Sequence, residues 1–253
     1  MSVSAHPLWR TVVLSPHFDD AALSLGGLLP LLPGPTAIVT VYGGAPPADA
    51  PTSWWDSSCG FSSAAEAYRC RRAEDVAACG LLGAEQVVLD HPDGPYADSA
   101  ELPGLDAFLE TLVPDVRLLV PLGTNQPDHA TVRRRALKVL AALRAPLPWV
   151  YADLPYTGHL PEWGTDEADA ALTVNTTYGP AYRELMDGHR TTVRHGLRLD
   201  DDQWARKRAA VLCHGSQHAA LAGDHGAFLA RTGPLSAELI WSLEPGTPPE
   251  AGS

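Results

Sequence analysis

The chain has 253 residues, of which 45% are hydrophobic, and a formal net charge of −12. This length suits one sizeable domain without disulfide bonds, and the negative charge disfavours nucleic acid and anionic membrane surfaces as partners. Four cysteines without metal-ligand or redox spacing, and an N-terminus without a basic and apolar leader, predict a cytoplasmic protein with free thiols. Scarce lysine beside abundant arginine, alanine, glycine and proline suggests a GC-rich bacterial genome.

Strand-like and helix-like segments alternate over the first 152 residues. Strands are expected at 11–15, 37–42, 86–89, 117–121 and 149–152. Helices are expected at 21–31, 64–79, 105–112 and 130–144. This alternation is typical of βαβ units, so we predict an α/β fold with a Rossmann-like, mainly parallel sheet flanked by helices.

The pattern becomes looser after residue 153. A connection rich in Pro, Gly and Thr reaches about residue 180, and a strand (191–199), a helix (202–213) and a last strand (237–243) follow. We predict one domain over 1–253. It would comprise a Rossmann-like core (1–153), a variable part on the substrate side (154–243) and a disordered tail (244–253).

The segment Ser15-Pro16-His17-Phe18-Asp19-Asp20 lies where the first strand gives way to the first helix. His17 and Asp20 offer an imidazole and a carboxylate, which a catalytic Zn²⁺ accepts while it keeps a position open for water. Asp19 would then be a second carboxylate beside the metal, free to act as a base. Alternatively, Asp20 caps the helix, Asp19 interacts with the helix dipole and His17 is an ordinary loop residue.

A second segment, Gly123-Thr124-Asn125-Gln126-Pro127-Asp128-His129, again joins a strand to a helix. Loops at the carboxyl ends of parallel strands converge on one crevice, so His129 could join His17 and Asp20 as a third metal ligand. In the alternative interpretation, Pro127 and Asp128 simply begin a helix and His129 has no partner.

These residues resemble the PIG-L/LmbE-like zinc-dependent deacetylases, which hydrolyse N-acyl groups of amino sugars and related conjugates. The first family motif is matched by Pro16, His17, Asp19, Asp20, Gly26 and Gly27, and the second by Pro127, Asp128 and His129. Two further blocks are similar to family helices: Arg71-Arg72-Ala73-Glu74 with Leu82-Gly83, and Lys207 to Ala210 with His214-Gly215-Ser216-Gln217.

The chain departs from the family pattern at three positions. Phe18 replaces a proline, which leaves the ligand spacing unchanged but gives up a fixed backbone angle. Ala21 replaces a glutamate and so removes a carboxylate from the edge of the site. Gln126 replaces a histidine that polarises the scissile carbonyl or the tetrahedral intermediate. A glutamine can stabilise an oxyanion by donating a hydrogen bond, but it cannot carry a proton.

The resemblance implies one Zn²⁺ per chain, or another divalent metal, held by His17, Asp20 and His129. Asp19 would accept the proton of the attacking water and return it to the leaving amine. Asp128 would orient a histidine.

Residues on the substrate side are expected in three places. The irregular stretch 43–63 carries Trp54 and Trp55, which could stack on a sugar or fill a local surface core. The resemblance implies that Arg71 reaches the substrate, with a surface ion pair as the alternative. Asp93 follows the third strand and could bind substrate hydroxyls or belong to a plain turn.

His214 and His218, four residues apart near the end of the late helix, could share a face and point at a metal. A structural or supporting role near the substrate is the preferred interpretation. No constellation is visible for His6, His159, His189, His195 and His225, which are interpreted as surface or packing residues.

We therefore predict a zinc-dependent amide hydrolase that removes an N-acyl group, most simply acetyl, from an amino sugar or a glycosylated secondary metabolite. Its partner is a small N-acylated molecule. Two alternatives stay open: an amidase of a thiol conjugate, resembling the mycothiol-conjugate amidases, and a catalytically weak zinc-binding protein, suggested by Gln126 and Ala21. The retained Asp19 argues against the second alternative, because a pure binder needs no base beside the metal.

Overall fold

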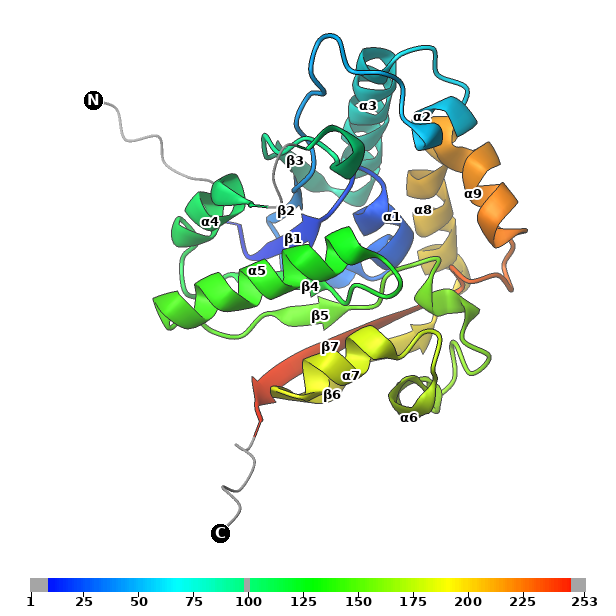
Figure 1. The fold of residues 1–253 in the computed structure, drawn as a ribbon. Helices are drawn as coiled ribbons and strands as arrows, with labels where there is room; N and C mark the ends of the chain where they lie inside the picture. Colours follow the sequence, from blue (N-terminus) through cyan, green and yellow to red (C-terminus); the bar gives the residue numbers. More distant parts are fainter. Residues whose placement is uncertain (1–8, 98–100, 247–253) are drawn as a thin grey trace.

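The computed structural model describes residues 9–97 and 101–246 (Figure 1). Within these ranges, seven strands form one sheet in the order β3-β2-β1-β4-β5-β7-β6. The strands are β1 (Thr11–Ser15), β2 (Thr36–Thr40), β3 (Ala84–Val88), β4 (Arg117–Pro121), β5 (Trp149–Tyr151), β6 (His189–Arg198) and β7 (Ala237–Pro245). The first five strands are parallel, whereas β7 runs antiparallel to both β5 and β6. The predicted mainly parallel α/β sheet is confirmed.

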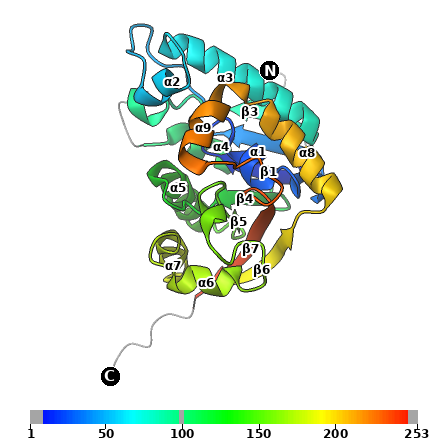
Figure 2. The same cartoon turned by 90° about the vertical axis from the view of Figure 1, so that its right-hand side faces the viewer.

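Helices cover both faces of the sheet (Figure 2). One face carries α1 (Asp20–Leu25), α3 (Ala64–Leu82) and α8 (Asp201–Leu212), and the other carries α4 (Pro103–Glu110), α5 (Pro127–Leu143) and α7 (Pro180–Met186). Three short helices lie outside these layers: α2 (Trp54–Ser58), α6 (Ala168–Val174) and α9 (His218–His225). None of the helices in the described ranges combines the length and the apolar character that a membrane crossing requires.

The centre of the sheet is formed by short apolar strands. Every residue of β1 and β2 is buried, which fits parallel strands that are covered by helices on both faces. The chain moves outward from β1 through β2 to β3 and then returns to β4 on the other side of β1. This reversal opens a crevice beyond the carboxyl ends of β1 and β4, the usual position of a ligand site in such sheets.

The end of α1 is fixed by close packing against the C-terminal part of the chain. A Cβ atom at Gly27 would come within 2.7 Å of the Leu199 side chain. The backbone N–H groups of Gly27 and Leu28 each donate to the Glu238 carboxylate at 2.8 Å. Glu238 also pairs with Lys207 at 2.9 Å, and both side chains are fully buried. The Gly-Gly pair therefore allows α1 to lie directly against α8 and β7.

Several sequence-based boundaries need correction. The helix expected over 21–31 ends at Leu25, and a separate 3₁₀ turn, Leu29–Leu31, contains Pro30. The stretch 43–63 is not wholly irregular because it contains α2, and the connection before residue 180 contains α6. Residues 244 and 245 were expected in the tail but belong to β7, which extends to Pro245. Residues 247–253 of that tail lie outside the described residues.

Candidate active site

The loop between β1 and α1 places two carboxylates side by side in the crevice. The Ser15 hydroxyl donates to the His17 carbonyl at 2.7 Å and accepts from the Ala21 N–H at 3.1 Å, which holds the loop against the helix. The helix begins at Asp20, and the Asp19 side chain makes no capping hydrogen bond. The alternative in which Asp20 is the cap residue is therefore wrong, and the buried Asp19 carboxylate is not used for capping.

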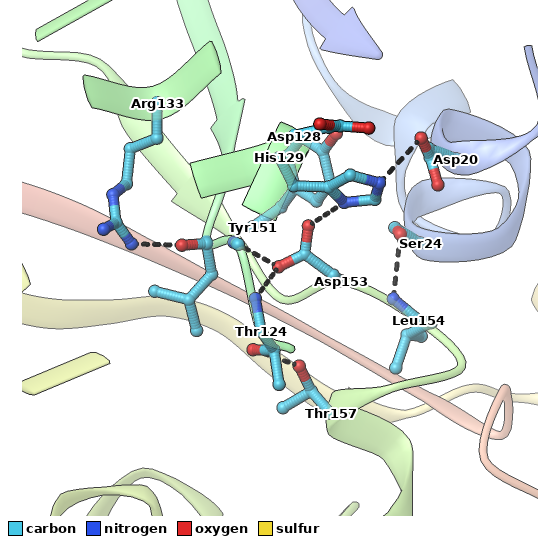
Figure 3. A network of polar contacts seen from close by, with 12 residues as sticks. Asp20, Ser24, Thr124, Asp128, His129, Arg133, Tyr151, Asp153, Leu154 and Thr157 are labelled. Carbon is cyan, nitrogen blue, oxygen red and sulfur yellow. Dashed lines mark hydrogen bonds and ion pairs between the residues drawn. The ribbon is translucent and has the colours of Figure 1, made fainter. Parts of the chain in front are cut away.

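His17, Asp20 and His129 converge as the sequence predicted. Asp20 Oδ2 lies 3.2 Å from His17 Nδ1 and 3.2 Å from His129 Nε2. One candidate ligand atom from each residue lies within 4.8 Å of the other two, and Asp20 and His129 are buried. Figure 3 shows His129 reaching from the first turn of α5 towards Asp20 on α1. Two imidazoles and a carboxylate form a donor set that suits Zn²⁺ with an open position for a further ligand.

Sequence reasoning missed Asp153, which fixes the orientation of His129. Its Oδ1 lies 2.7 Å from His129 Nδ1, and its Oδ2 accepts from the Gly123 and Thr124 N–H groups at 2.5 and 2.9 Å (Figure 3). A proton on Nδ1 leaves the Nε2 lone pair directed at the proposed metal position, as in other histidine ligands that donate to a carboxylate. Asp153 follows the end of β5 just as His17 follows the end of β1. Its place after a strand could therefore have indicated from the sequence that Asp153 belongs to the site.

The electrostatics of this cluster favour a bound cation. Burial lowers the pKa of His129, but Asp20 and Asp153 outweigh burial and raise it to about 9. Burial raises the pKa of Asp20, yet His129 and His17 bring it well below its usual range. The negative potential that stabilises protons on these imidazoles would equally stabilise a divalent ion that replaces them. The residues therefore fit the implied metal.

Asp19 has the opposite pKa shift from its neighbour. Burial, followed by the nearby charge of Asp20, raises the pKa of Asp19 to about 6. A carboxylate in this range can accept a proton near neutral pH and can also release it again.

The second nitrogen of His17 faces two further carboxylates. His17 Nε2 lies 3.2 Å from Asp93 Oδ1 and 3.5 Å from Asp128 Oδ2, and Tyr42 stacks on the same ring. Asp128 therefore lies beside a histidine, as expected from its predicted orienting role. Asp93 also accepts from the Gly94 N–H at 2.7 Å, so it belongs to a turn as well as to the cavity wall. The predicted functions of Asp93 and Asp128 stay predictions.

These groups open into a cavity of about 380 Å³. Nine of the predicted site residues line it: His17, Asp19, Asp20, Trp54, Trp55, Arg71, Asp93, Gln126 and Asp128. Five other aromatic residues share the wall: Phe18, Tyr42, Tyr68, Tyr96 and Tyr156. The cavity lining thus combines carboxylates with aromatic side chains. This combination suits a small molecule with apolar ring faces.

A family model described as GlcNAc-PI de-N-acetylase, PIG-L, matches residues 12–140. The chain belongs to this family of deacetylases. No curated protein sequence matches the chain significantly. The family match over residues 12–140 confirms the PIG-L resemblance that was inferred from the motifs.

Solved structures share the fold at low sequence identity. A deacetylase variant from the teicoplanin biosynthetic pathway is 20% identical, with a TM-score of 0.71 over 95% of this chain and 100% of that chain. The A40926 pseudoaglycone deacetylase is 23% identical, with a TM-score of 0.68 over 94% and 98%. A 4-carboxy-2-hydroxymuconate hydratase from Pseudomonas putida is 16% identical, with a TM-score of 0.53 over 96% and 99%. Since a hydratase shares the fold, the fold alone does not determine the reaction.

Two departures from the PIG-L pattern lie at the cavity. Gln126 lines it at the start of α5, and its side chain makes no capping hydrogen bond. Phe18, in place of the family proline, is buried and packs against Tyr68 with ring centroids 6.2 Å apart. Gln126 is therefore placed where its amide could face a substrate, and its catalytic role stays a prediction.

Trp54, Trp55 and Arg71, which were predicted on the substrate side, line the cavity. Trp55 Nε1 donates to Gln217 Oε1 at 3.1 Å, whereas Trp54 is 74% exposed. Arg71 does form an ion pair, but not a surface one: its Nη2 lies 2.7 Å from Asp56 Oδ1, and the two side chains are only 12% and 2% exposed.

The expectation that His214 and His218 share a helix face is wrong. Because α8 ends at Leu212, His214 lies in the following turn and His218 begins α9. His218 Nε2 lies 2.9 Å from the Val211 carbonyl oxygen, and His214 is buried without lining the cavity.

His225, interpreted from the sequence as a surface or packing residue, lines the cavity. Its ring meets Tyr156 edge-on at 5.3 Å, and its Nδ1 lies 2.9 Å from His159 Nε2. The sequence carried no signal for this position, because the pairing depends on how α9 packs.

Proposed function

We propose that the chain is a zinc-dependent hydrolase that removes an N-acetyl group from an amino sugar carried by a small glycosylated molecule. One observation carries this proposal: His17, Asp20 and His129 form a donor set beside Asp19, whose carboxylate makes no capping hydrogen bond, and His17, Asp19 and Asp20 line one cavity. This arrangement provides a cation site and a base side by side.

The chemistry divides among the residues as follows. His17, Asp20 and His129 would hold Zn²⁺, and the bound ion would supply Lewis-acid chemistry that polarises a carbonyl and makes water more acidic. Asp19 accepts the proton of the attacking water and returns it to the amine when the C–N bond breaks. The Gln126 amide donates a hydrogen bond to the oxygen that develops negative charge. The products are acetate and a free amine.

The substrate class is proposed from the cavity and from the structural relatives. One of the relatives is described as a deacetylase of the teicoplanin biosynthetic pathway, and another as the deacetylase of the A40926 pseudoaglycone, an antimicrobial reagent. Trp54, Trp55 and Tyr156 give this cavity flat apolar surfaces on which sugar or aromatic rings can stack. A glycosylated secondary metabolite from a bacterial pathway fits these features, and the cytoplasmic location inferred from the sequence remains part of the proposal.

Two other functions remain to be distinguished by experiment. An amidase acting on a thiol conjugate would use the same metal and base, and would differ only in the substrate. A zinc-binding protein without catalysis is disfavoured by Asp19, because burial and Asp20 raise its pKa into the range useful to a base.

The test combines metal analysis with a product assay. Zinc-loaded protein is incubated with N-acetylated sugars, N-acetylated glycosides and an N-acylated thiol conjugate, and released primary amine is measured. We expect one zinc per chain and amine release from a sugar substrate. His129→Ala is the matched control and should lose both. Zinc content equal to wild type in His17→Ala and His129→Ala proteins would contradict the proposed site.

A further inference from the structure

Arg71 is the only lysine or arginine among the described residues that line the cavity. The whole sequence has just two lysines, Lys138 and Lys207. Lys207 is buried against Glu238, and Lys138 borders a separate hollow next to α4 and α5. Recognition of an anionic substrate group by a lysine or arginine side chain would therefore depend on Arg71.

The charge of Arg71 is neutralised within the wall. Arg71 Nη2 lies 2.7 Å from Asp56 Oδ1, and its guanidinium lies 5.6 Å from the Phe61 ring centroid. Asp56 is itself held in place, because the Tyr96 hydroxyl donates to its Oδ2 at 2.5 Å. Asp56 is buried. Arg71 could bind a phosphate only if this ion pair separated. Separating a buried ion pair is strongly unfavourable in free energy, because it leaves a buried charge without its partner.

The remaining charged groups of the wall repel anions. In the part of the chain that the structure describes, six carboxylates line the cavity: Asp19, Asp20, Asp56, Asp93, Asp128 and Asp224. The negative charges of these carboxylates exceed the positive charges that Arg71 and one bound divalent cation would bring. The N-termini of α1 and α5 could otherwise attract a phosphate, but each carries an aspartate in its first turn, Asp20 and Asp128.

We propose that Asp56 determines substrate specificity: by pairing with Arg71, it makes the cavity accept N-acetylated sugars that are uncharged or cationic and reject those that carry a phosphate or carboxylate on the sugar. Arg71 stays on the cavity wall, but the Arg71–Asp56 pair as a whole carries no net charge. This inference rests on the proposed function and names its substrate class.

The test compares N-acetylglucosamine with N-acetylglucosamine 1-phosphate by titration calorimetry on the zinc-loaded protein. Wild type should bind the phosphorylated sugar about tenfold or more weakly than the neutral sugar, because like charges placed together in a binding site are strongly unfavourable. Asp56→Asn keeps the side-chain shape but frees the Arg71 charge. Affinity of this variant for the phosphorylated sugar should rise about tenfold, while affinity for the neutral sugar stays near wild type.

Two further variants serve as controls. Asp224→Asn removes another carboxylate from the cavity wall, one that is exposed, and should leave the ratio of the two affinities within about threefold of wild type. The double variant Asp56→Asn with Arg71→Gln replaces the ion pair by a neutral pair of similar shape. It should discriminate as wild type does, and it keeps the test valid if Asp56→Asn alone unfolds.

Equal binding of the two sugars by wild type would overturn the inference. So would an unchanged affinity ratio in folded Asp56→Asn, or a loss of phosphorylated-sugar binding in the double variant, since that loss would show Arg71 to be a phosphate ligand. Absence of binding of both sugars at millimolar concentrations would overturn it together with the amino-sugar substrate class. Selective binding without amine release would instead contradict only the proposed hydrolysis.

Discussion

Asp19 and Asp20 are adjacent in the chain and buried together, yet their pKa values move in opposite directions. Burial raises both, but the two histidines that contact Asp20 outweigh burial there. Asp19 instead experiences the negative charge of Asp20, and its pKa rises to about 6. One carboxylate is thereby kept ionised, as a metal ligand requires, and the other is brought into the range of a base.

Replacing Asp19 with asparagine should separate these roles. The asparagine side chain keeps a similar shape but cannot accept a proton, so we expect zinc content to stay at wild type and turnover to fall by about 10²-fold or more. Wild-type activity should rise with pH as Asp19 loses its proton, with a midpoint below the metal-free pKa of about 6 because the bound cation favours the ionised carboxylate, and this limb should disappear in the variant. A pH–rate profile with metal analysis measures both. Loss of zinc would show that Asp19 is a ligand, and unchanged turnover would eliminate it as the base.

Gln126→Ala tests the neutral replacement of the family histidine. If the amide stabilises the oxyanion, its loss should cost about 2–4 kcal/mol of transition-state stabilisation. The change should appear in kcat with little change in KM, because the hydrogen bond forms only as charge develops. Steady-state kinetics on the true substrate provide the measurement. A wild-type rate would make Gln126 a spectator, and His225 at the cavity wall would be the next side chain to test.

Asp153→Asn should weaken metal binding without removing a ligand. The amide cannot reproduce the carboxylate that accepts from His129 Nδ1 at 2.7 Å, so we expect zinc affinity to fall about 10- to 100-fold, as for other histidine-supporting carboxylates. Competition with a fluorescent zinc chelator measures this affinity. Thr157→Val, at another buried position of the same network, is the control and should keep zinc affinity close to wild type. Equal affinities in Asp153→Asn and wild type would contradict the assigned role.

At the scale of elements, the sequence predicted which strand ends meet but not which side chains turn inward. The runs 11–15 and 117–121 are apolar enough to reveal buried parallel strands, and polar residues directly after them indicated the site. Asp153 follows a strand of only three residues, a weak signal. The possibility that His214 and His218 share one helix face failed because α8 ends at Leu212, and the position of His225 on the cavity wall depends on the helix that follows this break.

Helix α3 contains a buried carboxyl group whose titration should affect stability. Burial, only partly offset by the Gln86 amide at 2.6 Å, raises the pKa of Asp75 to about 7. The folded state therefore binds the Asp75 proton more tightly than the unfolded state does, and this stabilisation is lost as pH rises from about 4 through about 7. We expect Asp75→Asn to be more stable than wild type at pH 8 by roughly 1–3 kcal/mol, with the difference shrinking towards pH 5. Urea unfolding at several pH values measures this, and a pH-independent difference would contradict it.

At the scale of the whole molecule, the C-terminal part is joined to the N-terminal core by buried polar contacts as well as by the sheet. Glu238 on β7 accepts from two backbone N–H groups at the end of α1 and pairs with Lys207 on α8. Ser216 after α8 donates to Glu74 on α3 through its N–H and hydroxyl groups at 2.8 and 2.7 Å. These contacts favour the predicted single domain, because neither part can separate without leaving buried charges unpaired.

Lys207→Met should therefore destabilise the entire chain rather than the C-terminal part alone. The substitution leaves the Glu238 carboxylate buried without its cation, which typically costs about 3–5 kcal/mol. Urea unfolding followed by both tryptophan fluorescence and circular dichroism should give one shared transition at lower denaturant. Adding Glu238→Gln should recover part of the loss, since the neutral amide removes the unpaired charge and can still accept from a backbone N–H. Two separate transitions would contradict the single domain, and a double variant no more stable than Lys207→Met would show that packing, not the unpaired charge, dominates the loss.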